Sequence, residues 1–76
     1  MEGFKREWQV VDGTVGLGEV VHIIILNKGK YEVRSGKVEI KGFHVSVAGE
    51  PIIPSKMLEK VYKDKRKADM EVILRR

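Results

Sequence analysis

The sequence contains no cysteine and few aromatic or amide side chains. Without cysteine the chain can form neither a disulfide nor a thiolate metal site, so apolar burial or a partner subunit must stabilise it. A chain of 76 residues buries only about 60% of the surface that its unfolded form exposes. Gln9 and Asn27 are the only amide side chains among many Lys, Glu, Val and Ile residues. This composition is typical of proteins that work at high temperature, and we expect a thermophilic source.

Long hydrophobic segments are also lacking. The longest apolar run, residues 20–26, is far shorter than the roughly 20 residues that cross a bilayer. The first eight residues, MEGFKREW, are charged and have no apolar core like that of a secretion signal. With 42% hydrophobic and 34% charged residues, the composition predicts one folded domain over residues 1–76. We therefore expect a cytoplasmic protein that does not contact membranes.

Glycines separate short β-branched segments and predict the turns of a strand meander. Residues 19–26, EVVHIIIL, are apolar on both faces, so this strand needs cover on both sides. The expected strands are residues 8–11, 19–26, 31–34 and 38–47, with turns at 12–13, 16–18, 27–30 and 35–36.

The hydrophobic alternation changes phase within residues 38–47. Val38 and Ile40 share one parity, whereas Val45 and Val47 share the other. A one-residue slip moves side chains to the opposite face of a strand, so residues 41–42 must absorb it. A hairpin turn and a glycine bulge both do so, and the hairpin is the preferred interpretation.

The C-terminal third is predicted to hold a short helix and a last strand. Pro54 precedes the helix, Ser55 is placed to cap it, and residues 57–62 continue it at helical spacing. Residues 70–74 alternate as a strand with Met70, Val72 and Leu74 facing inward. The expected fold is mainly β (α+β). It is a small antiparallel β-barrel or curled sheet of five to six short strands, SH3-like or OB-like, with one short C-terminal helix before the last strand.

Two segments near the end, IIPSKMLEKV and MEVIL, lie in an order known from one domain family. They resemble the close of PRC-barrel domains, in which a proline-led segment precedes the last strand. Residues 63–69 are an insertion relative to that pattern. The resemblance implies a small barrel that ends with a short helical segment and a closing strand.

Positive charge is concentrated in the last 21 residues. Residues 1–55 contain seven basic and seven acidic side chains, whereas residues 56–76 contain eight basic and four acidic ones. Such a basic surface releases counterions from phosphates, and exposed aromatic rings stack on bases. The alternative is a solvated helix end whose cations complement the helix dipole. The candidate nucleic-acid residues are Lys60, Lys63, Lys65, Arg66, Lys67, Arg75 and Arg76, with Tyr31 and Phe43 as stacking rings.

The strand that is apolar on both faces suggests a second kind of contact. If one helix leaves part of this strand uncovered, a second copy of the chain would cover the remainder. The candidate oligomer interface is Val21, His22, Ile23 and Ile25. The alternative is that the helix and the barrel bury the strand within one chain.

No pattern in the sequence indicates catalysis, a cofactor or a metal. His22 and His44 have no further ligands at a recognised spacing. The glycine-rich residues 13–18 are followed by a predicted strand, whereas a phosphate cradle needs a helix N-terminus there. The three serines have no His and Asp arrangement that the sequence specifies.

The expected function is that of a non-enzymatic binding module. Its first candidate partner is anionic, namely nucleic acid, contacted through the basic C-terminal helix and loop. The alternative is a structural or adaptor domain that acts by protein–protein contact and self-association through the apolar strand.

Overall fold

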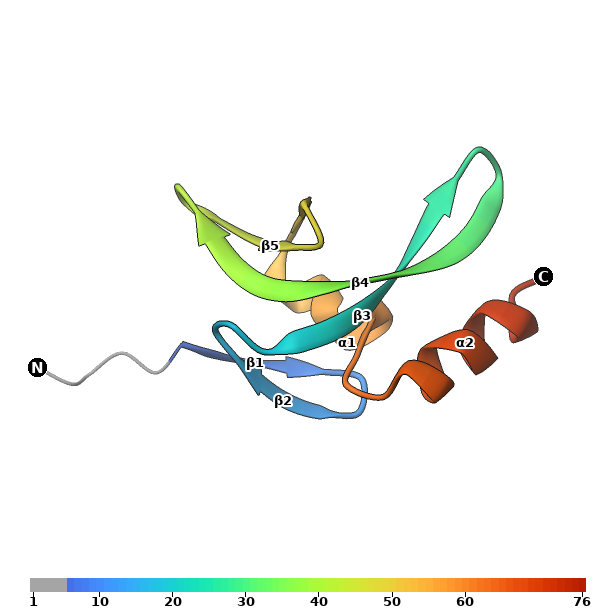
Figure 1. Cartoon of the computed structure of the whole chain (residues 1–76), viewed down its shortest axis with the longest axis horizontal. Coiled ribbons are helices and arrows are strands. Elements are labelled where there is room, and N and C mark those ends of the chain that lie inside the picture. The colour runs from blue at the N-terminus through green and yellow to red at the C-terminus, as the bar shows by residue number, and fades with distance from the viewer. Residues whose placement is uncertain (1–5) are drawn as a thin grey trace, which may run out of the picture.

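A computed structural model describes residues 6–76. Seven strands, one 3₁₀ helix and two α-helices follow one another along the chain (Figure 1). They are β1 (Glu7–Val10), β2 (Gly13–Gly16), β3 (Val20–Asn27), β4 (Lys30–Lys41), β5 (His44–Val47), β6 (Glu50–Ile52), η1 (Pro54–Lys56), α1 (Met57–Lys60), β7 (Val61–Tyr62) and α2 (Lys65–Leu74).

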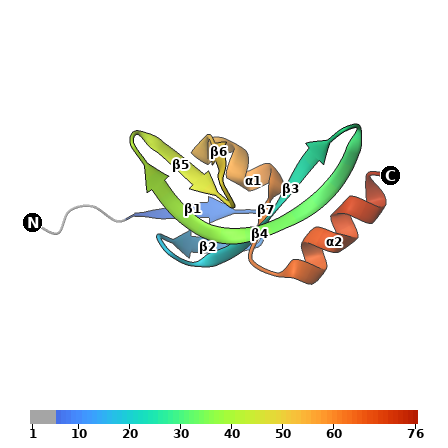
Figure 2. The ribbon, with the colours of Figure 1, turned by 45° about the horizontal axis from the view of Figure 1, so that its top comes forward.

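The strands form two antiparallel sheets. The hairpin of β1 and β2 is one sheet, and the other has the order β6-β5-β4-β3-β7. Figure 2 shows the long strand β4 bending across the molecule, with α2 beside the far end of the β3–β4 hairpin. The prediction of a mainly β, antiparallel fold is confirmed, and no closed barrel is found among residues 6–76.

Tight turns lie where glycines predicted them. The β3–β4 turn has Lys28 and Gly29 at φ 53° and 80°, with Asn27 opposite Lys30. Positive φ at both central residues is the geometry that suits the right-handed twist of a two-residue hairpin. The β4–β5 connection is also a two-residue hairpin, with Lys41 opposite His44. The hairpin interpretation of residues 41–42 is therefore confirmed over the bulge.

The predicted turn at residues 35–36 is wrong, because β4 runs without a break from Lys30 to Lys41. Gly36 serves close packing instead of a turn. A Cβ at this position would lie 2.6 Å from the Cα of Ala48, in the β5–β6 turn. A glycine inside a strand often marks such a close backbone approach.

The predicted last strand, residues 70–74, is also wrong, because these residues belong to α2. Asp64 caps this helix by accepting the amide of Arg66 at 2.9 Å. Ala68 and Val72, four residues apart, are buried, whereas Met70 and Leu74 are exposed. The inward alternation predicted for Met70, Val72 and Leu74 therefore holds only at Val72.

The predicted helix after Pro54 is shorter than expected. Ser55 lies inside η1 and makes no cap, since Ile53 occupies the cap position. Val61 and Tyr62 leave the helix and pair with β3 as β7, opposite Ile23 and His22. Pairing with the backbone of β3 thus holds these two residues in an extended conformation.

β3 is covered on both faces within one chain. On one face Val21 and Ile23 belong to the main core, to which every strand and α1 contribute. On the other face Ile24 packs with three residues of the C-terminal segment. The main core is Val10, Val15, Val21, Ile23, Val38, Val47, Ile52, Met57 and Val61, and the second cluster is Ile24, Tyr62, Ala68 and Val72.

Candidate functional site

Most of the predicted basic residues lie along α2 and at its two ends. Lys65, Arg66 and Lys67 form the first turn of the helix, and Lys63 precedes it. Arg75 and Arg76 follow its last residue and line a hollow together with Lys30 from the β3–β4 hairpin. Lys60, the last residue of α1, is half-buried. We call the following set the basic layer: Lys30, Lys63, Lys65, Arg66, Lys67, Arg75 and Arg76.

The acidic side chains of this segment are already engaged. Asp69 pairs with Lys65 at 3.1 Å, and Glu71 pairs with Arg75 at 3.0 Å. Asp64 accepts the amide of Arg66 as the helix cap. Within residues 6–76 five cations of the layer form no ion pair: four lie along α2 and at its ends, Lys63, Arg66, Lys67 and Arg76, and the fifth is Lys30 in the β3–β4 hairpin.

The helix dipole does not explain the cations in the first turn of α2. A helix N-terminus carries partial positive charge, so Lys and Arg are favoured at the other end. The first turn of α2 has no acidic residue and holds Lys65, Arg66 and Lys67. Among the predicted cations, the alternative that they stabilise a helix C-terminus therefore applies to Lys60 at the end of α1 and to Arg75 and Arg76 at the end of α2.

Asp12, in the β1–β2 turn, fixes the start of α2. Its carboxylate accepts the amides of Lys63 at 2.7 Å and Asp64 at 3.0 Å. Partial burial alone would raise the pKa of Asp12, but the backbone hydrogen bonds and the nearby Lys67 outweigh it and hold the pKa below 3.8. An ionised Asp12 thus positions the most basic part of the chain.

Tyr31 lies in the basic layer but is not a free stacking ring. The guanidinium of Arg75 lies 5.4 Å from the centroid of the ring. The ring also packs against the second cluster, and it is half-buried. Arg75 donates a hydrogen bond from Nε to the carboxylate of Glu71 at 3.0 Å, which raises the pKa of Arg75 and holds this cation in place.

Phe43 lies away from the basic layer. It is in the β4–β5 turn, which Figures 1 and 2 both show at the opposite end of the molecule from α2. The structure therefore does not combine the two predicted stacking rings into one surface. Phe43 is fully exposed, at 102% of its reference area.

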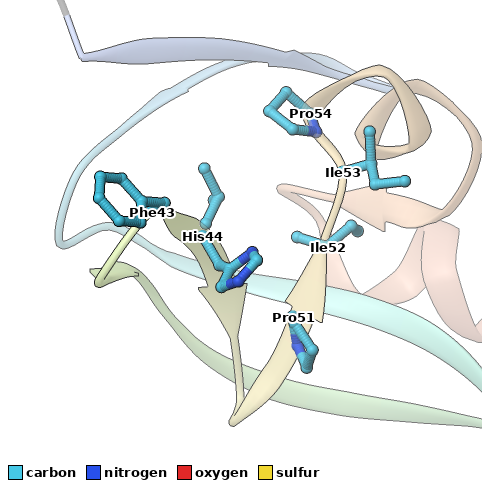
Figure 3. Close-up of a pocket in the computed structure, with 7 residues that line it drawn as sticks. Phe43, His44, Pro51, Ile52, Ile53 and Pro54 are labelled. Carbon is cyan, nitrogen blue, oxygen red and sulfur yellow. The ribbon is translucent and has the colours of Figure 1, made fainter.

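A groove lies beside Phe43 and was not predicted from the sequence. Figure 3 shows Phe43, in the β4–β5 turn, and His44, at the start of β5, on one side of a hollow and the segment from Pro51 to Pro54 on the other. We call this hollow the Phe43 groove; its lining is Phe43, His44, Val45, Pro51, Ile52, Ile53 and Pro54. A usable signal was present, because prolines bracket two isoleucines in PIIP shortly after an aromatic turn residue.

Among the described residues, three ion pairs lie near the Phe43 groove, whereas only two of the seven cations of the basic layer, Lys65 and Arg75, are paired. Lys41 lies 4.0 Å from Glu39 across the β4 surface. At the other side Glu50 accepts from Arg34 at 3.1 Å, and Lys56 lies 3.6 Å from Glu59. The two ends of the molecule thus differ in their charge.

The residues predicted for an oligomer interface lie mostly inside the chain. Val21 and Ile23 are 0% and 2% exposed in the main core, and Ile25 packs against that core. His22 is half-buried, with its Nδ1 2.7 Å from the hydroxyl of Ser35. Val21, Ile23 and Ile24 of EVVHIIIL are therefore covered by the chain itself, whereas Val20 and Leu26 near its two ends are 56% and 62% exposed.

No arrangement for metal binding is found among residues 6–76, where no three His, Asp or Glu side chains converge. In the glycine-rich residues 13–18, the amide of Gly16 donates a hydrogen bond to the carboxylate of Glu19 at 2.7 Å. This amide therefore binds a side chain of the same chain. In the described part of the chain no helix has the length and hydropathy to span a bilayer.

Comparisons of the chain with protein-family models, with curated proteins and with solved structures found no match. The resemblance of residues 52–74 to PRC-barrel domains thus stays a prediction. A proline-led segment does precede the short strand β7, but residues 70–74, the expected closing strand, are helical.

Proposed function

We propose that this protein is a non-enzymatic binding module that contacts nucleic acid through the basic layer. One observation carries the proposal: four cations without ion pairs gather along one helix and its ends. The acids beside them are already engaged, and the charges of residues 1–55 sum to zero. Unpaired cations on one surface are the electrostatic footprint of a polyanion site.

The dimensions of α2 suit a few phosphates. A helix of ten residues is about 15 Å long, and one DNA strand carries a phosphate about every 3.4 Å along the duplex axis. About four phosphates therefore lie alongside the helix. Neutralising them gives a slope of roughly −3 to −4 in log affinity against log salt concentration.

The arrangement of the two sheets also supports a binding module. We infer that the β1–β2 hairpin and the five-stranded sheet act together as one small, partly open barrel. Val10 and Val15 of the hairpin lie in the main core, and the amide of Val11 donates to the carbonyl of Val61 in β7 at 2.9 Å. Small OB-like and SH3-like barrels commonly serve as binding modules.

The test is fluorescence anisotropy with mixed-sequence duplex DNA, single-stranded DNA and RNA at low and at physiological salt. The test variant combines Lys63→Glu, Arg66→Glu and Lys67→Glu. The control variant combines Lys37→Glu, Lys41→Glu and Lys56→Glu, which changes the net charge equally but lies outside the basic layer. Circular dichroism checks that both variants fold.

We expect the test variant to lose about a hundredfold or more in affinity at low salt and the control to lose only a few-fold. Equal losses in both variants would mean that net charge, and not this layer, determines binding. No binding of the unchanged protein to any of the three probes would refute the proposal.

A second candidate function, that of an adaptor domain, has its own supporting observation. The outer side of α2 exposes Met70, Ile73 and Leu74 at 61%, 57% and 75%. Large apolar side chains on an exposed helix face mark contacts with other proteins more often than with phosphates. This function would be favoured if an acidic, leucine-containing peptide binds the basic layer and nucleic acid does not.

A further inference from the structure

Phe43 is the most exposed large apolar side chain in residues 6–76. No part of the described chain covers its ring, although only five aromatic residues are present in the sequence. An uncovered aromatic ring loses the burial of about 150–250 Å² that such side chains contribute in a core or an interface. The ring is therefore available to a partner.

The Phe43 groove next to this ring is apolar at its rim. Ile53 is 65% exposed, and Pro51 and Pro54 are exposed beside it. In Figure 3, Phe43 lies on one side of the hollow, with Ile53 and Pro54 on the other. A projecting ring and an adjoining apolar hollow on the same surface are self-complementary, as an interface with two-fold symmetry requires.

The backbone at this edge disfavours the addition of an extended peptide as a further strand. β6 is the edge strand of the five-stranded sheet and has only three residues, Glu50–Ile52. Its middle residue, Pro51, has no N–H to donate to another strand. A partner at this edge must therefore be held by side chains.

The charge pattern selects a second copy of the chain as that partner. Three cations near the groove are paired with acids: Lys41 with Glu39, Arg34 with Glu50 and Lys56 with Glu59. Two copies can therefore meet here without like-charge repulsion. The exposed apolar face of α2 lacks this property, because unpaired cations would oppose one another across a two-fold axis there.

We propose that the protein self-associates through the Phe43 groove, with the Phe43 ring of each copy seated in the groove of the other. The two Phe43 rings together bury about 300–500 Å², so the interface is small beside the roughly 1,200 Å² at which stable specific interfaces begin. The dimer is consequently weak and depends on concentration. The interface is independent of the proposed nucleic-acid function, because α2 lies at the opposite end of the molecule.

The test is sedimentation velocity of the full chain from about 10 µM to about 1 mM, a range that brackets weak association. We compare the unchanged protein with Phe43→Ser and with Leu74→Ser, a matched control at an exposed apolar residue of α2. Both residues are exposed, so neither change disturbs the core. We expect a concentration-dependent shift toward dimer in the unchanged protein and in Leu74→Ser, and monomer throughout in Phe43→Ser.

A second measurement locates the contact. Because the chain has no cysteine, Lys41→Cys provides a single site for a spin label next to the β4–β5 turn. The spin-labelled protein is mixed with ¹⁵N-labelled protein that carries no spin label. The spin label should then broaden the amide signals of Ile53 and Phe43 in the ¹⁵N-labelled copy. Signals of α2 should stay sharp.

Three results would overturn the proposal: a monomer at every concentration, a dimer that persists in Phe43→Ser, or broadening centred on α2. The nucleic-acid affinity is read separately. A Phe43→Ser protein that is monomeric but binds nucleic acid at low concentration supports both proposals. Loss of self-association has no bearing on the anisotropy result obtained with the basic-layer variant.

Discussion

The two faces of β3 are covered in different ways. The face with Val21 and Ile23 belongs to a core to which all seven strands and α1 contribute. The face with Ile24 is covered by α2, where only Ala68 and Val72 of the helix are buried. The fold is therefore a strongly connected β-rich body with a lightly attached helix.

This difference predicts that local stability varies across the molecule. Segments with few buried apolar contacts open at lower free energy than the core. The basic layer lies on the lightly attached side, and the main core does not depend on residues of α2. A binding surface can therefore be built on this side of β3 without weakening the core.

Replacing Gly36 by Ala tests the strongly connected side and has the largest expected effect. The added Cβ would lie 2.6 Å from the Cα of Ala48, and backbone atoms cannot yield as a flexible side chain can. Overpacking of this kind costs about 2–3 kcal/mol in the free energy of unfolding. Urea denaturation should show this loss, and hydrogen exchange should show it for the amides of β3 and β4, whereas amides of α2, which exchange through local opening of lower free energy, should change less.

Gly18→Ala is the matched control for Gly36→Ala. A Cβ at Gly18 would meet open space, but the backbone there has a positive φ of 89°. The control separates the cost of backbone conformation from that of close packing. An unfolding free energy of Gly36→Ala equal to that of the unchanged protein would contradict the close approach of β4 and the β5–β6 turn.

Replacing Val72 by Ala tests the lightly attached side. Val72 is 6% exposed in the second cluster, and losing its two methyl groups costs about 2 kcal/mol. Since the cluster is small, we expect faster hydrogen exchange in α2 and little change in the main core. Met57→Ala is the contrasting variant, because Met57 is fully buried in the main core and its loss should affect all strands. Uniform loss of protection in Val72→Ala would show that the two sides unfold together.

Replacing Asp12 by Asn tests the connection between the two sides and has the smallest expected effect. The carboxylate accepts two amides at the start of α2, and losing its charge should cost about 1 kcal/mol at neutral pH. The folded-state pKa of Asp12 is below 3.8, so its contribution is complete above about pH 4 and is lost as the pH falls through the folded value. Unfolding free energies of the two proteins should therefore converge as the pH falls below the ordinary pKa of an aspartate.

The control for this experiment is Asp69→Asn, which removes an exposed ion pair with Lys65 but no backbone hydrogen bond. Its cost should be smaller, because exposed ion pairs contribute about 0–1 kcal/mol. A difference between Asp12→Asn and the unchanged protein that grows on acidification would contradict the sign of the Asp12 pKa.

Much of the β-meander could be predicted because its signals are local. The turns at residues 27–30 and 41–44 follow from glycines that adopt positive φ, and from the change in hydrophobic phase between Ile40 and Val45. The cover needed on both faces of β3 was also visible as an apolar run without alternation. These features depend on neighbouring residues alone.

Local patterns failed where distant contacts decide the structure. Gly36 looks like a turn residue, but the β5–β6 turn packs against it and requires glycine within a strand. Residues 70–74 alternate like a strand, but Asp64 caps a helix there and Ala68 and Val72 bury one face of it. In both cases the signal fits two structures, and packing selects one.

Composition, periodicity and the order of charges are enough to assign the class of the protein: a small, cysteine-free, mainly β chain whose excess positive charge lies in its last third. The arrangement of the candidate surfaces depends on the three-dimensional fold. The fold places the basic residues on a helix beside β3, buries Val21 and Ile23, and leaves Phe43 next to a groove at the other end. The physical reason is that composition and periodicity act along the chain, whereas exposure and charge pairing depend on which segments meet in space.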